Sequence, residues 1–182
     1  MWARKSDNLH ALSAALGFRA ESAQAEGNMA LAVALHEEAL LNARQIGSLW
    51  GEALTETHLG RLAFAQQRYQ QARQHYGNAL ALYRTFGSDV YLAWCLEAVA
   101  ALDVAEGNHM RAVIISAGTE TLRANGGSPR PPAEQDAFEH ALAGCRTALD
   151  DEAYQRAWTT GLAAPRDALI RLALGEDDAL AQ

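Results

Sequence analysis

The feature that most constrains this chain is a repeat with a period of forty residues. The string AEGN occurs at 25–28 and again at 105–108, two periods apart, and the copy between them reads AQQR at 65–68. Other residues coincide under the same shift: the Gly-Ser pairs at 47–48, 87–88 and 127–128, and Ala32, Ala72 and Ala112. Self-similarity at a period of about 20–50 residues indicates stacked units that bury their apolar faces on their neighbours.

Each unit is predicted to form two helices, because its apolar residues recur at three- and four-residue spacing. Alanine, leucine, glutamate and arginine are common, and no run alternates as a strand would, so the fold class is all-α. Gly27 and Gly107 end the first helix of their units, and the Gly-Ser pairs end the second, with the serine free to cap the next helix. Gly60 lies mid-helix and predicts the close approach of a neighbouring helix.

The predicted boundaries follow the repeat. The first helices are expected at about 9–26, 49–66 and 89–106, and the second helices at about 28–45, 69–85 and 108–124.

The two ends depart from the repeat. Residues 1–8 align with the end of a second helix, and Asp7-Asn8 takes the place of Gly-Ser, so the chain is expected to start in the tail of a missing repeat, as a fragment of a longer protein would. SPRPPAE at 128–134 is a loop into helices at about 132–149, 150–160 and 165–174, with Asp150 or Asp151 as a cap. We therefore expect three repeats over 1–128 and a helical cap over 129–182, with a frayed polar tail after Gly175.

Charge and composition exclude several classes of function. The net charge is -7 and Lys5 is the single lysine, which argues against direct binding of nucleic acid. The chain has no signal peptide and no apolar run of membrane-spanning length, so a cytoplasmic setting is expected. Cys95 and Cys145 are expected to be small buried residues, although a disulfide stays open.

The sequence contains no complete catalytic or metal-binding motif. HEEAL at 36–40 lacks the second histidine of a zinc HExxH motif, and DDEAY at 150–154 lacks the third acid of DDxxD. Neither GxSxG nor GxGxxG occurs, nor does a P-loop. We predict that the chain is not an enzyme and has no catalytic residue, cofactor site or metal site.

Residues 59–80 resemble the tetratricopeptide repeat through Leu59-Gly60, Ala63, Ala72, Tyr76 and Ala79. Repeats of the HEAT or armadillo kind also have periods near forty, but this spacing favours the tetratricopeptide family. The resemblance implies a right-handed superhelix whose first helices line a concave groove for a protein, a peptide or a small effector. It places seven residues there: Glu21, Gln24, Thr57, Arg61, Phe64, Trp94 and Glu97. Packing between repeats is the competing explanation for the two aromatic residues, and Trp50, Tyr154 and Trp158 are expected in the core.

The whole layout resembles the C-terminal region of bacterial signal-transduction ATPases that regulate transcription, of the LuxR and maltose-regulator kind. Tyr154, Trp158, Gly161 and the helix at 168–174 carry this narrower resemblance. It implies that the chain senses or docks a partner and thereby shifts a neighbouring ATPase domain between its forms. A free-standing adaptor and a small-molecule-binding or catalytic helical protein stay open as alternatives. An N-terminal edge left by a missing repeat would also allow a homodimer.

Overall fold

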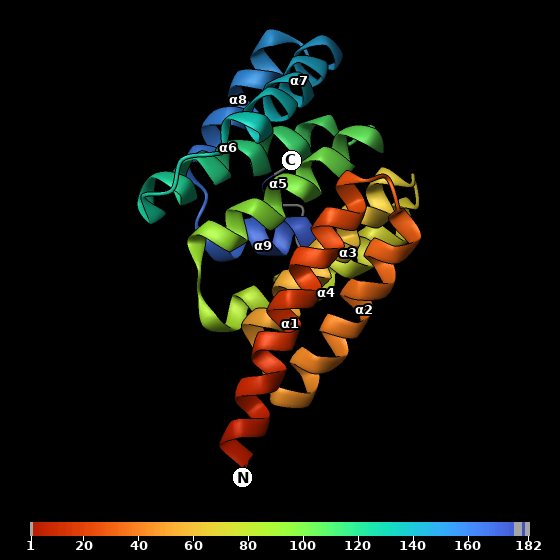
Figure 1. Cartoon of the computed structure of the whole chain (residues 1–182). Coiled ribbons are helices and arrows are strands. Elements are labelled where there is room, and N and C mark those ends of the chain that lie inside the picture. Colours follow the sequence, from red (N-terminus) through yellow and green to blue (C-terminus); the bar gives the residue numbers. More distant parts are fainter. Residues whose placement is uncertain (1, 177–179, 181–182) are drawn as a thin grey trace. The chain divides into compact units, whose positions relative to one another are not determined.

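In a computed structural model, the chain is helical throughout the part that is described (Figure 1). The backbone is described for residues 2–176 and 180, and the side chains for residues 9, 11–176 and 180. The helices within this part are α1 Trp2–Ala25, α2 Met29–Ile46, α3 Leu49–Ala65, α4 Tyr69–Phe86, α5 Asp89–Ala105, α6 His109–Gly126, α7 Pro132–Ala148, α8 Asp151–Ala163 and α9 Arg166–Leu174. No strand occurs among these residues, so the predicted all-α fold class is confirmed.

The predicted helix boundaries agree with α2 to α9 within a few residues, but the prediction for α1 is wrong. This helix was expected to begin near residue 9, and it runs unbroken from Trp2 through the expected turn at Asp7-Asn8. The physical reason is that this position lacks a glycine. Gly47 and Gly127 end their helices with φ of +69° and +60°, a conformation that other residues adopt only at a cost.

The AEGN turn is the same in all three copies. Gly27 and Gly107 have φ of +80° and +82°, and in the middle copy Gln67 has φ of +59°. In each copy the residue after the left-handed one donates its backbone N–H to a carbonyl five positions earlier, as Arg68 does to Ala63 at 2.9 Å. The fold therefore requires this turn strongly enough to hold a non-glycine residue in a left-handed conformation.

The residues up to Phe86 form the first of two compact units. Within it α2 packs against both α1 and α3, and α3 packs against α4. The predicted close approach at Gly60 is confirmed, because a β-carbon there would lie 2.4 Å from the Tyr76 ring. Ser48 caps α3 as expected by accepting a hydrogen bond from the Gly51 backbone at 3.2 Å.

A buried carboxylate also joins three helices of the first unit. Glu56 on α3 accepts hydrogen bonds from Arg44 on α2 at 2.8 Å and from Asn78 on α4 at 3.3 Å. Its other oxygen lies 2.7 Å from Nδ1 of His75 on α4. The charge of Glu56 is thus compensated inside the helix stack.

The residues from Gly87 form the second compact unit. Here α6 packs against α5, α7, α8 and α9. Gly161 on α8 allows the closest approach, since a β-carbon there would lie 2.2 Å from the Ile114 carbonyl oxygen. Asp150 caps α8 by accepting a hydrogen bond from Ala153 at 2.7 Å, as predicted.

The two compact units meet at residues 86–87, so the third helix pair groups with α7 to α9 rather than with the first two pairs. The sequence predicts a different boundary, at residue 128, between the repeats and the C-terminal helical cap. That boundary stays a prediction. The predicted fraying of the tail falls largely on residues 177–179, 181 and 182, which lie outside the described residues.

None of the described helices combines the length and the apolar character that crossing a membrane requires.

Candidate functional site

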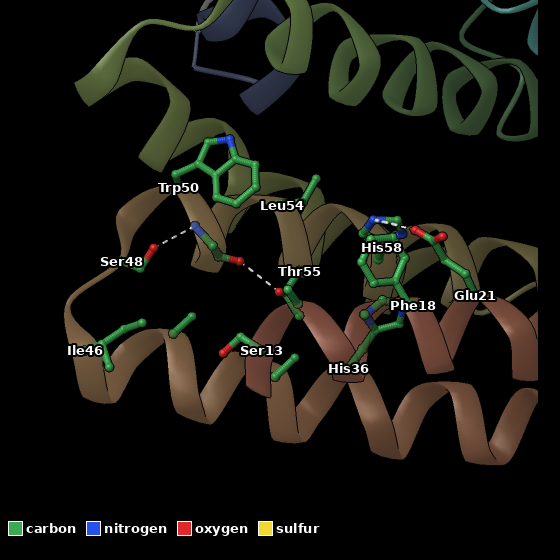
Figure 2. Close-up of a pocket in the computed structure, with 15 residues that line it drawn as sticks. Ser13, Phe18, Glu21, His36, Ile46, Ser48, Trp50, Leu54, Thr55 and His58 are labelled. Carbon is green, nitrogen blue, oxygen red and sulfur yellow. Dashed lines mark hydrogen bonds and ion pairs between the residues drawn. The ribbon is translucent and has the colours of Figure 1, made fainter. Parts of the chain in front are cut away.

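A cavity of about 210 Å³ lies in the first unit, among α1, α2 and α3 (Figure 2). The helix α2 contacts both of the others, and its residues contribute to the lining between them. On each helix the lining residues recur at helical spacing, so each helix turns one face toward the cavity. The lining residues are Ser13, Ala14, Gly17, Phe18 and Glu21 from α1; His36, Ala39, Ala43 and Ile46 from α2; Ser48 from the α2–α3 turn; and Trp50, Gly51, Leu54, Thr55 and His58 from α3. We call this cavity the α1–α3 pocket.

Two stacked histidines form one end of the α1–α3 pocket. The rings of His36 and His58 lie with centroids 4.7 Å apart and planes at 15°. Burial lowers the pKa of His36 to about 4. Burial, followed by the fields of His36 and Arg61, lowers the pKa of His58 to about 3. Both rings are therefore neutral at pH 7.

The Oε1 atom of Glu21 lies 4.0 Å from Nε2 of His58 (Figure 2). That distance is too long for a hydrogen bond. The lining residues that the structure describes include no lysine or arginine, although the charge of Arg61 acts on His58. The α1–α3 pocket therefore presents mostly apolar walls with a single carboxylate at one end.

Two buried polar atoms of the lining have no partner. They are Oγ of Ser13 and Nε2 of His36, and neither makes a hydrogen bond to any residue that the structure describes. Buried polar atoms are bonded in most proteins, and an unsatisfied one costs about 1–3 kcal/mol. A hydroxyl both donates and accepts, and a neutral imidazole nitrogen does one or the other. Both atoms are shielded from solvent, so they lie behind the walls of the pocket and not on its open surface.

Gly17 leaves open space in the wall of the pocket. A β-carbon at this position would meet no atom within 4 Å, in contrast to Gly60, where a ring fills the space. A mid-helix glycine costs about 1 kcal/mol relative to alanine, and no packing contact explains it here. Next to it, Phe18 is 73% exposed, and Trp50 on α3 is 46% exposed. The prediction that Trp50 lies in the core is wrong, because α3 turns its first-turn residue toward the pocket and solvent.

The seven predicted groove residues are divided between the two units. In the first unit only Glu21 lines the α1–α3 pocket. Gln24 is partly exposed one turn further along α1, and Arg61 is partly exposed on α3. Phe64 packs against Tyr69 with centroids 5.8 Å apart.

Thr57 does not face a groove, and its predicted placement is wrong. Its side chain is fully buried, its hydroxyl donates to the Ala53 carbonyl at 2.9 Å, and it lies 3.5 Å from the Tyr83 hydroxyl. Thr57 therefore lies on the side of α3 that packs against α4.

The two predicted residues of the second unit take part in contacts within that unit. Trp94 donates its indole N–H to Glu134 at 3.0 Å, which ties α5 to α7. Glu97 accepts hydrogen bonds from Arg123 at 2.6 Å and from Arg130 at 2.7 Å. These bonds hold the proline-rich segment between α6 and α7 against α5, a role that the sequence did not indicate.

The other predicted core and cysteine residues are placed as expected. Tyr154 is buried, and the partly buried Trp158 stacks on it with centroids 6.2 Å apart. Cys95 and Cys145 are buried and free. Among the described residues no group of three or more potential metal ligands is close enough to hold an ion.

Comparison with known protein families finds a match to the first four helices, α1 to α4. The tetratricopeptide repeat family matches residues 11–85. This match supports the resemblance to the tetratricopeptide-repeat family that the sequence pattern indicates. It spans α1 to α4, the part that contains the α1–α3 pocket. No curated protein and no solved structure matches the chain.

Buried polar residues interrupt the third helix pair, which lies beyond the tetratricopeptide match. Asp103 is fully buried on α5 and forms an ion pair with Arg111 on α6, and Ser116 and Thr119 are buried on α6.

Proposed function

We propose that this chain is a helical protein-interaction domain and that the α1–α3 pocket anchors one side chain of a partner peptide or protein. The observation that carries the proposal is the open, mostly apolar pocket itself, which has the exposed rings of Phe18 and Trp50 among its lining residues. Tetratricopeptide repeats suggest protein interaction in general, and the pocket lies on the first helices of two successive units. Phe18 and Trp50 are exposed at the edge of the pocket. Aromatic residues are common among the few residues that contribute most of the binding energy at a protein interface.

The size of the pocket favours a side chain over a complete small molecule. Sites for drug-sized ligands have volumes of about 300–1,000 Å³. A cavity of about 210 Å³ is smaller than these, and it is larger than the roughly 150 Å³ that is enough to hold benzene. A single-ring or branched side chain presented by a longer segment fits this range.

Peptide selection on the whole chain tests the proposal. Peptides selected from a random display library would be measured by fluorescence polarisation against the wild-type chain and two matched variants. Gly17→Leu fills the pocket, and Gly144→Leu makes the same change at a helical glycine of α7 whose β-carbon also meets no atom within 4 Å. We expect Gly17→Leu to weaken binding at least about tenfold and Gly144→Leu to leave it within about twofold. Equal affinities for the two variants would refute the proposed site.

The finer proposal is that the chain is the sensing arm of a larger ATP-dependent transcriptional regulator. Its support is the order of repeats followed by a helical cap whose Tyr154, Trp158 and Gly161 all make packing contacts within the second unit. A partner in the pocket would then shift the neighbouring ATPase between two forms.

A free-standing adaptor is the alternative to this finer proposal. The reading frame upstream of Met1 in the source genome separates the two, because a regulator requires an in-phase P-loop ATPase. The homodimer through the N-terminal edge stays a prediction, which light scattering on the purified chain tests.

A further inference from the structure

We propose that α7, together with residues 128–131 before it, is a strap that Arg130 holds closed and that opens while the rest of the second unit stays folded. We call α7 and residues 128–131 the strap. This device is independent of the α1–α3 pocket and of any partner bound there. Three features of the second unit support it: the small buried face of α7, the contacts of Arg130, and the charges that remain when the strap leaves.

The helix α7 buries few of its own side chains. Leu142 and Cys145 are the buried residues among its seventeen. By comparison, α9 buries four of its nine residues. Packing of an apolar face is the main source of stability for a helix in a folded protein. The docking of α7 therefore depends to a large extent on contacts outside a hydrophobic core.

Arg130, two residues before the first residue of α7, supplies many of these contacts. Its side chain is 4% exposed and reaches three helices. It donates to Glu97 on α5 at 2.7 Å, to Glu120 on α6 at 2.8 Å and to Gln135 on α7 at 2.8 Å. Its guanidinium group also lies 3.5 Å from the centre of the Phe138 ring on α7. A planar guanidinium group is suited to making several such contacts at once.

The prolines on either side of Arg130 hold it in place. Pro129 and Pro131 each fix their own φ, and each disfavours the helical conformation in the residue before it. Pro131 itself has φ of -58° and ψ of 143°, an extended conformation. The side chain of Arg130 is therefore presented to its partners with a reduced loss of backbone entropy.

Both ends of α7 join extended backbone, and the helix that follows is fixed. Leu149, directly after α7, has φ of -107° and ψ of 150°. The next helix, α8, packs tightly on α6, since a β-carbon at Gly161 would lie 2.2 Å from the Ile114 carbonyl oxygen. Hence α7 has a non-helical joint at each end and can leave without moving α8.

The buried carboxylate of Glu97 keeps a counter-charge when Arg130 leaves. Arg123 on α6 donates to both of its oxygens, at 2.6 Å and 2.7 Å. Glu120, the other acid in contact with Arg130, is 41% exposed and therefore hydrated. A buried charge without a partner would make opening costly. Opening leaves no such charge behind, and the guanidinium group of Arg130 regains water.

Opening also breaks two contacts whose groups are within reach of water, and it exposes a thiol. Glu134, which is 30% exposed, accepts a hydrogen bond from Trp94 at 3.0 Å. The guanidinium group of the exposed Arg146 lies 4.9 Å from the centre of the Tyr154 ring on α8. Cys145 is fully buried while the strap is closed, so its reactivity reports opening.

Hydrogen–deuterium exchange of the whole chain, read by mass spectrometry, tests the proposal. In the wild-type chain we expect the amides of α7 to exchange at least about tenfold faster than those of α6. Arg130→Met removes the hydrogen bonds and keeps most of the length. It should speed exchange in α7 at least about tenfold further, with α6 and α8 within about twofold of wild type. Arg130→Lys keeps the charge without the planar group and should give an intermediate rate. Arg156→Met is the control, because Arg156 is 65% exposed on α8, and it should leave α7 unchanged.

A thiol reagent gives a second readout. In Arg130→Met without denaturant, Cys145 should react while Cys95, which is buried on α5, stays protected. In the wild-type chain both should stay protected over the same time. Equal exchange of α7 and α6 in the wild-type chain would overturn the proposal, as would unchanged α7 exchange in Arg130→Met. Equal acceleration in α6, α7 and α8, or reaction of both cysteines together, would show global unfolding and would also overturn it. If Arg130→Met does not fold, the wild-type comparison and Arg130→Lys decide.

Discussion

Replacing His36 with phenylalanine should raise the free energy of unfolding, and should raise it more at pH 5 than at pH 7. The His36 side chain is 1% exposed, and its Nε2 has no partner in the described part of the chain. Burial lowers its pKa to about 4 in the folded chain, against about 6.5 in an unfolded one. Because the folded pKa is the lower of the two, the unfolded chain binds more protons between these pH values. The wild-type chain therefore loses stability as pH falls through this window.

The magnitude follows from the two pKa values. Between pH 7 and pH 5, a histidine with these values lowers the free energy of unfolding by about 2 kcal/mol. Removing an unsatisfied buried nitrogen adds about 1–3 kcal/mol at any pH, less whatever the larger ring costs in packing. For His36→Phe we expect a gain of about 1 kcal/mol at pH 7 and about 3 kcal/mol at pH 5.

Urea unfolding followed by far-UV circular dichroism at the two pH values measures this difference. His140→Phe is the control, since this histidine is exposed on α7 and its replacement should change stability by less than about 0.5 kcal/mol at either pH. An equal gain from His36→Phe at pH 5 and pH 7 would show that the buried imidazole does not resist protonation. A loss at both would mean that the larger ring costs more in packing than the unpartnered nitrogen costs in the wild-type chain, which would refute the expected gain.

Three further predictions concern the second unit. Gly161→Ala should destabilise this unit by about 1–3 kcal/mol, because the new β-carbon would lie 2.2 Å from the Ile114 carbonyl oxygen and the backbone cannot easily move. Thermal melting measures this loss, and an unchanged melting temperature would contradict the packing of α8 on α6. Glu97→Gln should cost about 3 kcal/mol in urea unfolding, because it removes the charge that the buried guanidinium groups of Arg123 and Arg130 share, although Arg130 keeps its ion pair with Glu120. A change below about 1 kcal/mol would mean that the network is solvated. Burial raises the pKa of Cys145 to about 11, so a thiol reagent at pH 8 should label it only after unfolding, and mass spectrometry of the labelled native chain would detect any exception.

The repeat made most of the fold predictable. Glycine turns recur at a fixed spacing, so the ends of α2 to α6 could be read from the sequence, and even Gln67 keeps the turn because its neighbours in the chain require it. The start of α1 could not be predicted, because an alignment of Asp7-Asn8 with Gly-Ser carries no information about backbone conformation. A helix continues where no residue favours a left-handed turn.

The pocket could be predicted only in small part. Glu21, which the family resemblance assigns to a groove, is one of the lining residues, but the pocket depends on contacts between residues that are far apart in sequence. The stacking of His36 on His58 follows only from the packing of α2 on α3, which no local pattern in the sequence indicates. Gly17 is the residue from which the pocket could best have been predicted, because a glycine within a helix indicates either close packing or open space at that position.

The central claim is that a partner is held in the α1–α3 pocket, and mapping a bound peptide onto the chain by NMR tests it most directly. Backbone and imidazole signals would be compared in the free chain and with a saturating selected peptide. The account predicts that the largest changes lie at Gly17, His36, Gly51 and His58, with intermolecular contacts from one side chain of the peptide to the pocket walls. Changes centred on α4 or in the second unit, with these four residues unaffected, would contradict it.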